Sequence, residues 1–183
     1  RFGARIFKDN AATRLVLTAS LMILFTALAR LFLELGLDPY LTPLAGLSII
    51  GTMLLGPRLT FLMAVMASVN VGIMGGNDFL LSSALLLVSG FAVYAVVRVG
   101  SRQQLLGAGL VVAGAMAAVA FAVGLIGGAS FPAALWLGAL GFGNGLLSLG
   151  LALVLLPLLE DAFNVRTPMK LLESSDPGTP LMM

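Results

Sequence analysis

Long apolar stretches, each ended by a short polar, glycine- or proline-containing turn, dominate the pattern of hydrophobic and polar positions along the chain. A membrane-spanning helix needs about 20 mostly apolar residues. Glycine and proline end helices, and the polar groups of loops need water. The pattern therefore predicts an all-α fold, a polytopic transmembrane bundle of six helices. The six stretches run from about Leu15 to Leu35, Tyr40 to Leu55, Leu59 to Met74, Phe79 to Val97, Leu105 to Ile126 and Pro132 to Leu159.

The second and third stretches are the shortest, and each is near the lower limit for a helix that crosses a bilayer. Two structures are therefore open for them. Each can cross the membrane as a separate helix, or the two together can form a helical hairpin that does not cross completely.

The composition supports the membrane prediction and excludes several kinds of site. The chain has 183 residues, of which 60% are hydrophobic and 10% are charged, whereas a soluble domain is about half apolar and about a quarter charged. It contains no cysteine and no histidine. Disulfides, thiolate nucleophiles, zinc sites with the usual ligands and histidine general bases are thereby excluded within these residues. We expect no catalytic residue, cofactor or metal site in this segment.

The basic residues predict the orientation. If all six stretches cross, nine of the ten Lys and Arg residues fall on one side, whereas the opposite loops carry Asp38 and Asp78 and no basic residue. The positive-inside rule then places both ends in the cytoplasm. Residues 1–14 are expected to be a cytoplasmic basic loop, 15–159 the membrane domain and 160–183 a cytoplasmic linker. Because the basic residues are spread over short loops, membrane lipid is the expected partner and a nucleic acid polymer is not.

One basic residue lies outside these loops. Arg30 is in the outer half of the first stretch and Glu34 follows four residues later, so both share a helix face and can form an ion pair. A charge inside a membrane indicates a functional site by default. We prefer an interfacial pair in which Arg30 extends toward water, because Gly36 marks the helix end nearby.

Two asparagines lie within predicted spans, Asn70 in the third and Asn144 in the sixth. In hydrocarbon an amide needs a hydrogen-bond partner, so each indicates either a ligand or ion site or a contact between helices, and we favour the contact. Gly141 and Gly145 are four residues apart, a pattern that lets helix backbones approach closely. That approach can occur within the bundle or between protomers, so a homo-oligomer is open.

The end of the chain carries a more specific signal. Residues 157–173 read Pro-Leu-Leu-Glu, then Phe163, then Thr167, then Leu-Leu-Glu, with Ser-Asp-Pro two residues later. This run resembles the end of the membrane domain in bacterial seven-transmembrane HD-domain phosphohydrolases. Ser174 stands where that family has Leu, and Gly178-Thr179 where it has Asn-His, which indicates a divergent branch. Weaker similarities occur at 39–43, 54–58 and 98–106.

The resemblance implies that the chain holds the last six helices of a seven-helix anchor in the bacterial cytoplasmic membrane. An extracellular domain would precede the anchor and a cytoplasmic HD domain would follow it, as partners in the full-length protein. In that family the HD domain uses histidines and aspartates to hold two metals, manganese or iron, and hydrolyses cyclic di-AMP to pApA. No residue of that site can be assigned to this chain. A candidate relay linker consists of Thr167, Pro168, Leu171, Leu172 and Glu173.

Two other classes fit six helices with both ends inside. One is the substrate-binding membrane subunit of an energy-coupling-factor vitamin transporter, whose outward-facing polar pocket would draw on Asn70, Asn144 and the Arg30–Glu34 pair. The other is a scaffold component of a cell-envelope assembly, which would use small-residue helix faces as its interface.

Overall fold

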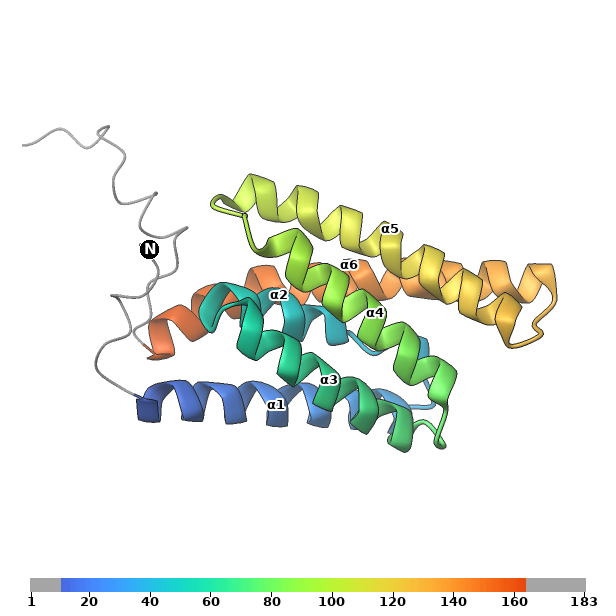
Figure 1. Ribbon diagram of the computed structural model, residues 1–183, viewed down its shortest axis with the longest axis horizontal. Helices are drawn as coiled ribbons and strands as arrows, with labels where there is room; N and C mark the ends of the chain where they lie inside the picture. Colours follow the sequence, from blue (N-terminus) through green and yellow to red (C-terminus); the bar gives the residue numbers. More distant parts are fainter. Residues whose placement is uncertain (1–10, 164–183) are drawn as a thin grey trace, which may run out of the picture.

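The computed structural model describes residues 11–163, which form an all-helical bundle (Figure 1). Within this range there are six α-helices, one 3-10 turn and no strand, which confirms the predicted fold class. Five of the helices, α1, α3, α4, α5 and α6, are long and apolar enough to cross a membrane. The elements are α1 (Ala11–Glu34), η1 (Pro39–Leu41), α2 (Leu44–Leu54), α3 (Pro57–Met74), α4 (Phe79–Val96), α5 (Arg102–Ile126) and α6 (Phe131–Phe163).

Successive helices run in alternating directions between the two ends of the bundle, so α1 begins and α6 finishes at the same end (Figure 1). We call this the basic end, because Arg14, Arg58, Arg98 and Arg102 lie at the helix termini there. The opposite end, here called the acidic end, carries Asp38 in the α1–η1 loop and Asp78 in the α3–α4 loop. The segregation of charge that the sequence predicts is therefore present in the bundle.

The second predicted helix is the part of the fold that differs most from expectation. The sequence predicts a single helix from Tyr40 to Leu55, but the structure has the η1 turn, a short extended link and the 11-residue helix α2. The link arises because Pro43 has no N–H and precedes the first helical residue. At about 1.5 Å per residue, α2 is only about 16 Å long, roughly half the hydrocarbon thickness of a bilayer.

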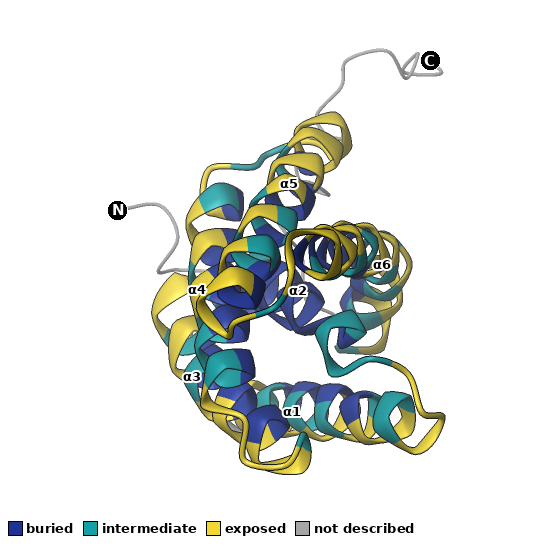
Figure 2. Ribbon diagram, turned by 90° about the vertical axis from the view of Figure 1, so that its right-hand side faces the viewer, coloured by how far each residue is buried: buried dark blue, intermediate teal, exposed yellow. Residues whose placement is uncertain are grey.

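The central position of α2 explains why its sequence is apolar on every side. Ten of its eleven residues are buried, and it packs against α1, α3, α4 and α6. Figure 2 shows the buried residues gathered around α2 and the exposed ones on the outward faces of the surrounding helices. A helix that is hydrophobic all round belongs in an interior, and here that interior is protein rather than lipid.

The sixth helix is longer than the sequence predicts. The expected boundary places the end of the membrane domain at Leu159 and the start of the linker at Glu160, but α6 continues through Pro157 and Glu160 to Phe163. Its buried face repeats every four residues, at Ser148, Ala152, Leu156 and Glu160, so this face continues beyond the predicted boundary. The helix therefore extends four residues past the predicted stretch, because the first charged residue does not end the buried face; where the membrane domain ends stays a prediction. Likewise, α1 begins at Ala11, inside the predicted basic loop.

Glycine lets α5 and α6 pack closely. A Cβ on Gly145 would overlap the backbone of Ala113, and one on Gly141 would lie 2.7 Å from the carbonyl oxygen of Met116. Gly109 of α5 meets the side chain of Leu149 in the same way. The spacing of Gly141 and Gly145 thus serves an interface within the bundle, and this close packing holds α6 in place.

Candidate functional site

Asn144 lies in α6, is fully buried, and makes three side-chain hydrogen bonds. Its Nδ2 donates hydrogen bonds to two main-chain carbonyl oxygens, that of Tyr40 at 2.6 Å and that of Thr42 at 2.8 Å. Its Oδ1 accepts a hydrogen bond from the Ser148 hydroxyl, one helical turn later, at 3.1 Å. Asn144 therefore connects α6 to the link between η1 and α2.

The link needs these bonds because it interrupts the regular hydrogen bonding of the backbone. The N–H of Thr42 bonds to the carbonyl of Pro39, and the N–H of Leu44 folds back onto the carbonyl of Thr42. Within residues 11–163, only Asn144 donates to the carbonyl of Tyr40. Irregular backbone at membrane depth is tolerated where protein satisfies its polar groups. We call this arrangement the broken-helix lock: Tyr40, Thr42, Asn144 and Ser148.

The geometry of the lock favours a structural role for Asn144. A side-chain amide can make about four hydrogen bonds, two as donor and two as acceptor, and protein groups occupy three of them here. Backbone packing is also close, since a Cβ on Gly46 of α2 would lie 3.3 Å from the carbonyl oxygen of Ser148. The amide thus holds two parts of the chain together and has little capacity left for a ligand.

Asn70 is placed differently. It lies on an exposed face of α3, and its side chain makes no hydrogen bond within the part of the chain that the structure describes. The expected partner on a neighbouring helix is therefore not among residues 11–163. Asn70 and Asn144 lie in different parts of the bundle and do not form a common site.

Arg30 and Glu34 do meet. Their side chains form an ion pair on the last turns of α1, with 2.8 Å between Nε of Arg30 and Oε1 of Glu34. The two side chains are 68% and 62% exposed, so the pair lies on the outside of the bundle near the acidic end. This geometry matches an interfacial pair more closely than a charge inside the protein.

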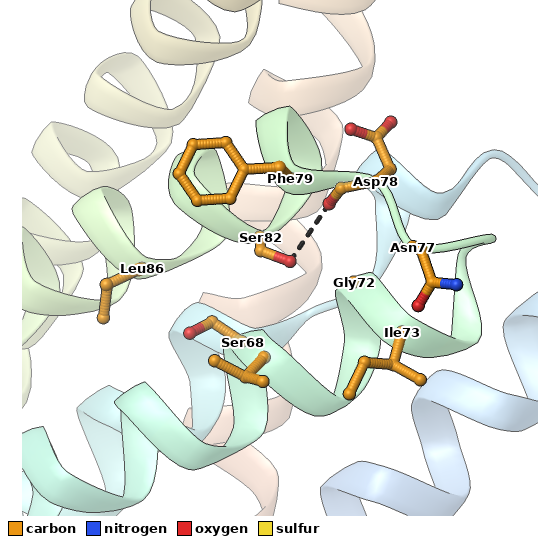
Figure 3. A pocket seen from close by; sticks show the side chains of 9 residues that line it. Ser68, Gly72, Ile73, Asn77, Asp78, Phe79, Ser82 and Leu86 are labelled. Carbon is orange, nitrogen blue, oxygen red and sulfur yellow. Dashed lines mark hydrogen bonds between the residues drawn. The ribbon is translucent and has the colours of Figure 1, made fainter.

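A pocket that the sequence analysis did not identify opens between α3 and α4 near the acidic end (Figure 3). Its volume is about 260 Å³. At one end of it lie Asn77 and Asp78, and at the other Ser68 and Leu86 (Figure 3). The signal in the sequence is the turn before Asp78, whose carboxylate accepts a hydrogen bond from the N–H of Leu81 and so caps α4. The full lining is Ser68, Val69, Gly72, Ile73, Asn77, Asp78, Phe79, Ser82 and Leu86.

Among residues 11–163, no group of three or more His, Cys, Asp or Glu side chains is arranged to hold a metal ion.

The candidate relay residues lie outside the described residues, so their role stays a prediction. They are Thr167, Pro168, Leu171, Leu172 and Glu173.

Comparison with known proteins adds one finding. Residues 1–167 match a family described as the seven-transmembrane receptor with intracellular HD hydrolase. This range includes every helix of the described bundle. No curated protein and no solved structure matches the chain.

Proposed function

Because the chain belongs to the family of seven-transmembrane receptors with an intracellular HD hydrolase, we propose that it is the membrane sensor domain that controls a cyclic di-AMP phosphodiesterase. Membership makes the chain a multi-pass membrane domain of a receptor whose family links it to an HD hydrolase. The choice of cyclic di-AMP as substrate and pApA as product rests on the resemblance at residues 157–173.

The observation that carries the proposal is the continuity of α6. Asn144 is bonded to the broken helix, and the same α-helix continues without a break to Phe163, where the described chain ends at the basic end. Phe163 comes 19 residues after Asn144, a distance of about 29 Å along a helix. A packed helix transmits a shift or rotation along its length. A change at the broken-helix lock is therefore transmitted to the segment that leads to the linker.

The orientation proposed here places the basic end in the cytoplasm, since loops rich in Lys and Arg stay on that side. Both described ends would then face the cytoplasm, and α6 would deliver the chain directly to a cytoplasmic hydrolase. The HD domain would hold the divalent metals, manganese or iron. Its metal site lies outside this chain, because the chain has no histidine. Lipid, the protein's own extracellular and HD domains and a second protomer are the partners proposed.

The candidate residues for the vitamin-carrier alternative do not support a substrate-binding site. Protein groups occupy Asn144, Asn70 faces outward, and Arg30 is paired on the surface of α1. These residues do not converge on one polar pocket in the described bundle.

The test of the proposed function uses full-length protein in lipid nanodiscs, with manganese and cyclic di-AMP. We expect pApA to form, and its absence would show that the proposed substrate is wrong. The relay is tested separately by inserting two alanines after Thr167, which rotates the downstream chain by about 200° if the segment is helical. We expect the insertion to change the turnover rate of the full-length protein. An unchanged rate would refute the relay and leave the substrate assignment intact.

A further inference from the structure

The turn η1 is held from two sides by side chains of neighbouring segments. At the acidic end, the half-buried Asp38 accepts a hydrogen bond from the N–H of Tyr40, with 2.9 Å between Oδ1 and the nitrogen. Toward the interior, the carbonyl of Tyr40 accepts from Nδ2 of Asn144 at 2.6 Å. The two main-chain polar groups of one residue are therefore bonded to the α1–η1 loop and to α6.

The main chain of η1 continues this connection. The N–H of Leu41 belongs to the same peptide group as the carbonyl of Tyr40, and it donates to the main-chain carbonyl of Asp38 at 2.9 Å. The next N–H, that of Thr42, donates to the carbonyl of Pro39 at 3.1 Å. Every peptide N–H from Tyr40 to Thr42 is thus bonded to Asp38 or to the residue after it.

The donors in this chain of hydrogen bonds all point toward Asp38. The Ser148 hydroxyl donates to Oδ1 of Asn144, and Nδ2 of the same amide donates to the carbonyl of Tyr40. The peptide group that contains this carbonyl donates in turn to the main-chain oxygen of Asp38. Hydrogen bonds aligned in one direction polarise and strengthen each other, and a bond to a carboxylate is stronger than one to a neutral group. The charge of Asp38 therefore lies at the end of the chain where it stabilises the aligned dipoles.

On its own, η1 has few interactions that fix its position. It consists of three residues, Pro39–Leu41, none of which is fully buried. Short 3-10 turns have poorer hydrogen-bond geometry than α-helices. The turn packs against α1, α4 and α6, so a change in its position reaches all three helices. Because η1 makes few bonds of its own, its position depends on Asp38 and Asn144.

We propose that Asp38 is a positioning residue for α6, and that η1 transmits its effect to Asn144. The proposal rests on the proposed function, because it names the point at the acidic end from which the relay along α6 is controlled. The bond to Asp38 holds the carbonyls of η1 and of the link where Nδ2 of Asn144 reaches both. When that bond is lost, η1 shifts, and α6 shifts with the amide that is bonded to it.

Solid-state NMR of the full-length protein in lipid bilayers tests the connection to Asn144. Tyrosine is labelled with carbon-13 at the carbonyl and asparagine with nitrogen-15 at the side-chain amide, and the dipolar dephasing between the labels reports their separation. We expect a Tyr40–Asn144 signal, assigned by its loss in Asn144→Leu. Asp38→Ala should reduce the dephasing by about twofold, because a charge-assisted bond is removed. Asp38→Asn, which keeps an acceptor oxygen, should restore most of it.

Asp78→Ala is the matched control. The carboxylate of Asp78 also caps a helix at the acidic end, but it accepts from the N–H of Leu81 in α4. This variant should leave the Tyr40–Asn144 dephasing unchanged. Unchanged dephasing in Asp38→Ala, or an equal loss in Asp78→Ala, would overturn the role of Asp38.

The shift of α6 is measured by electron paramagnetic resonance between two spin labels. Leu62→Cys on α3 and Leu158→Cys on α6 are exposed positions near the basic end, in full-length protein that carries no other cysteine. We expect Asp38→Ala and Asn144→Leu each to shift the mean distance by about 2 Å, with no further shift when they are combined. A distance that Asp38→Ala leaves unchanged would overturn the positioning of α6. Neither measurement involves hydrolysis, so each result is independent of whether the full-length protein cleaves cyclic di-AMP.

Discussion

Nδ2 of Asn144 lies 2.8 Å from the carbonyl oxygen of Thr42, a residue that precedes it by 102 positions. The same nitrogen donates to the carbonyl of Tyr40. One buried amide thus bonds to both sides of the break before α2 and fastens this segment to α6. We therefore expect this side chain to contribute to the stability of the bundle.

Asn144→Leu should destabilise the bundle. It removes the Asn144 donor from the partly buried carbonyl of Tyr40 and from the buried carbonyl of Thr42, and a buried polar group left unsatisfied costs about 1–3 kcal/mol. We expect the free energy of unfolding, measured by titration with a denaturing detergent, to fall by about 2 kcal/mol in total. Asn70→Leu is the matched control, because that amide is exposed on α3. Equal losses for the two variants would contradict a special role for Asn144.

Ser148→Ala should have a smaller effect. It removes the hydroxyl that donates to Oδ1 of Asn144, and one hydrogen bond contributes about 1 kcal/mol. Because both residues belong to the broken-helix lock, the effects of Ser148→Ala and Asn144→Leu should not add. A double-mutant cycle in the same unfolding assay measures this. Ser83→Ala, which removes a hydroxyl bonded only to its own helix, should give an additive result with Asn144→Leu.

Two glycine-to-alanine changes, one in α6 and one in α5, should change the stability of the bundle in opposite directions. In Gly145→Ala the new methyl group overlaps the backbone of Ala113, so the helices must separate, at a cost of about 1–3 kcal/mol. Gly114→Ala places a methyl group where nothing lies within 4 Å and should stabilise α5 by about 0.5–1 kcal/mol. Thermal unfolding in detergent compares them. A loss of stability in Gly114→Ala would mean that this exposed face is covered by a partner.

Arg30→Gln should change stability by no more than about 0.5 kcal/mol, because the partners are exposed and an i,i+4 ion pair on a helix surface contributes little. The proposed hydrolysis of cyclic di-AMP by the full-length protein, and its proposed regulation, should also stay unchanged. A large loss of regulation with unchanged stability would restore the interpretation of Arg30 as a functional charge. Glu34→Gln should match Arg30→Gln in both measurements.

Single cysteines can test the orientation, because the chain has none. Leu37→Cys places a thiol at the acidic end, and Gln103→Cys, on the first turn of α5, places one at the basic end. With a membrane-impermeant thiol reagent on intact cells, we expect labelling at Leu37→Cys and, only after the cells are opened, at Gln103→Cys. The reverse result would place the basic end outside and would be incompatible with a cytoplasmic hydrolase at the end of α6.

Much of the helix plan could be predicted because it depends on local properties. Apolar length predicted α1, α3, α4 and α5 to within a few residues, since the cost of exposing polar groups to hydrocarbon acts on each segment separately. Local properties were insufficient at α2 and at the end of α6. At α2, the apolar stretch forms a helix shorter than predicted, which neighbouring helices bury. At α6, packing against the bundle keeps the charged residue Glu160 within the helix.

The sequence by itself determined that this chain lies in a membrane, that its segments alternate in direction and that its positive charge gathers at one end, because length and charge can be read in one dimension. Only the tertiary structure decided between Asn70 and Asn144, which look alike as asparagines in apolar helices. It also brought Val69 and Asp78 together around one groove. The physical reason is that hydrogen bonds and cavities depend on how each helix is rotated and packed against the others, which no single segment specifies.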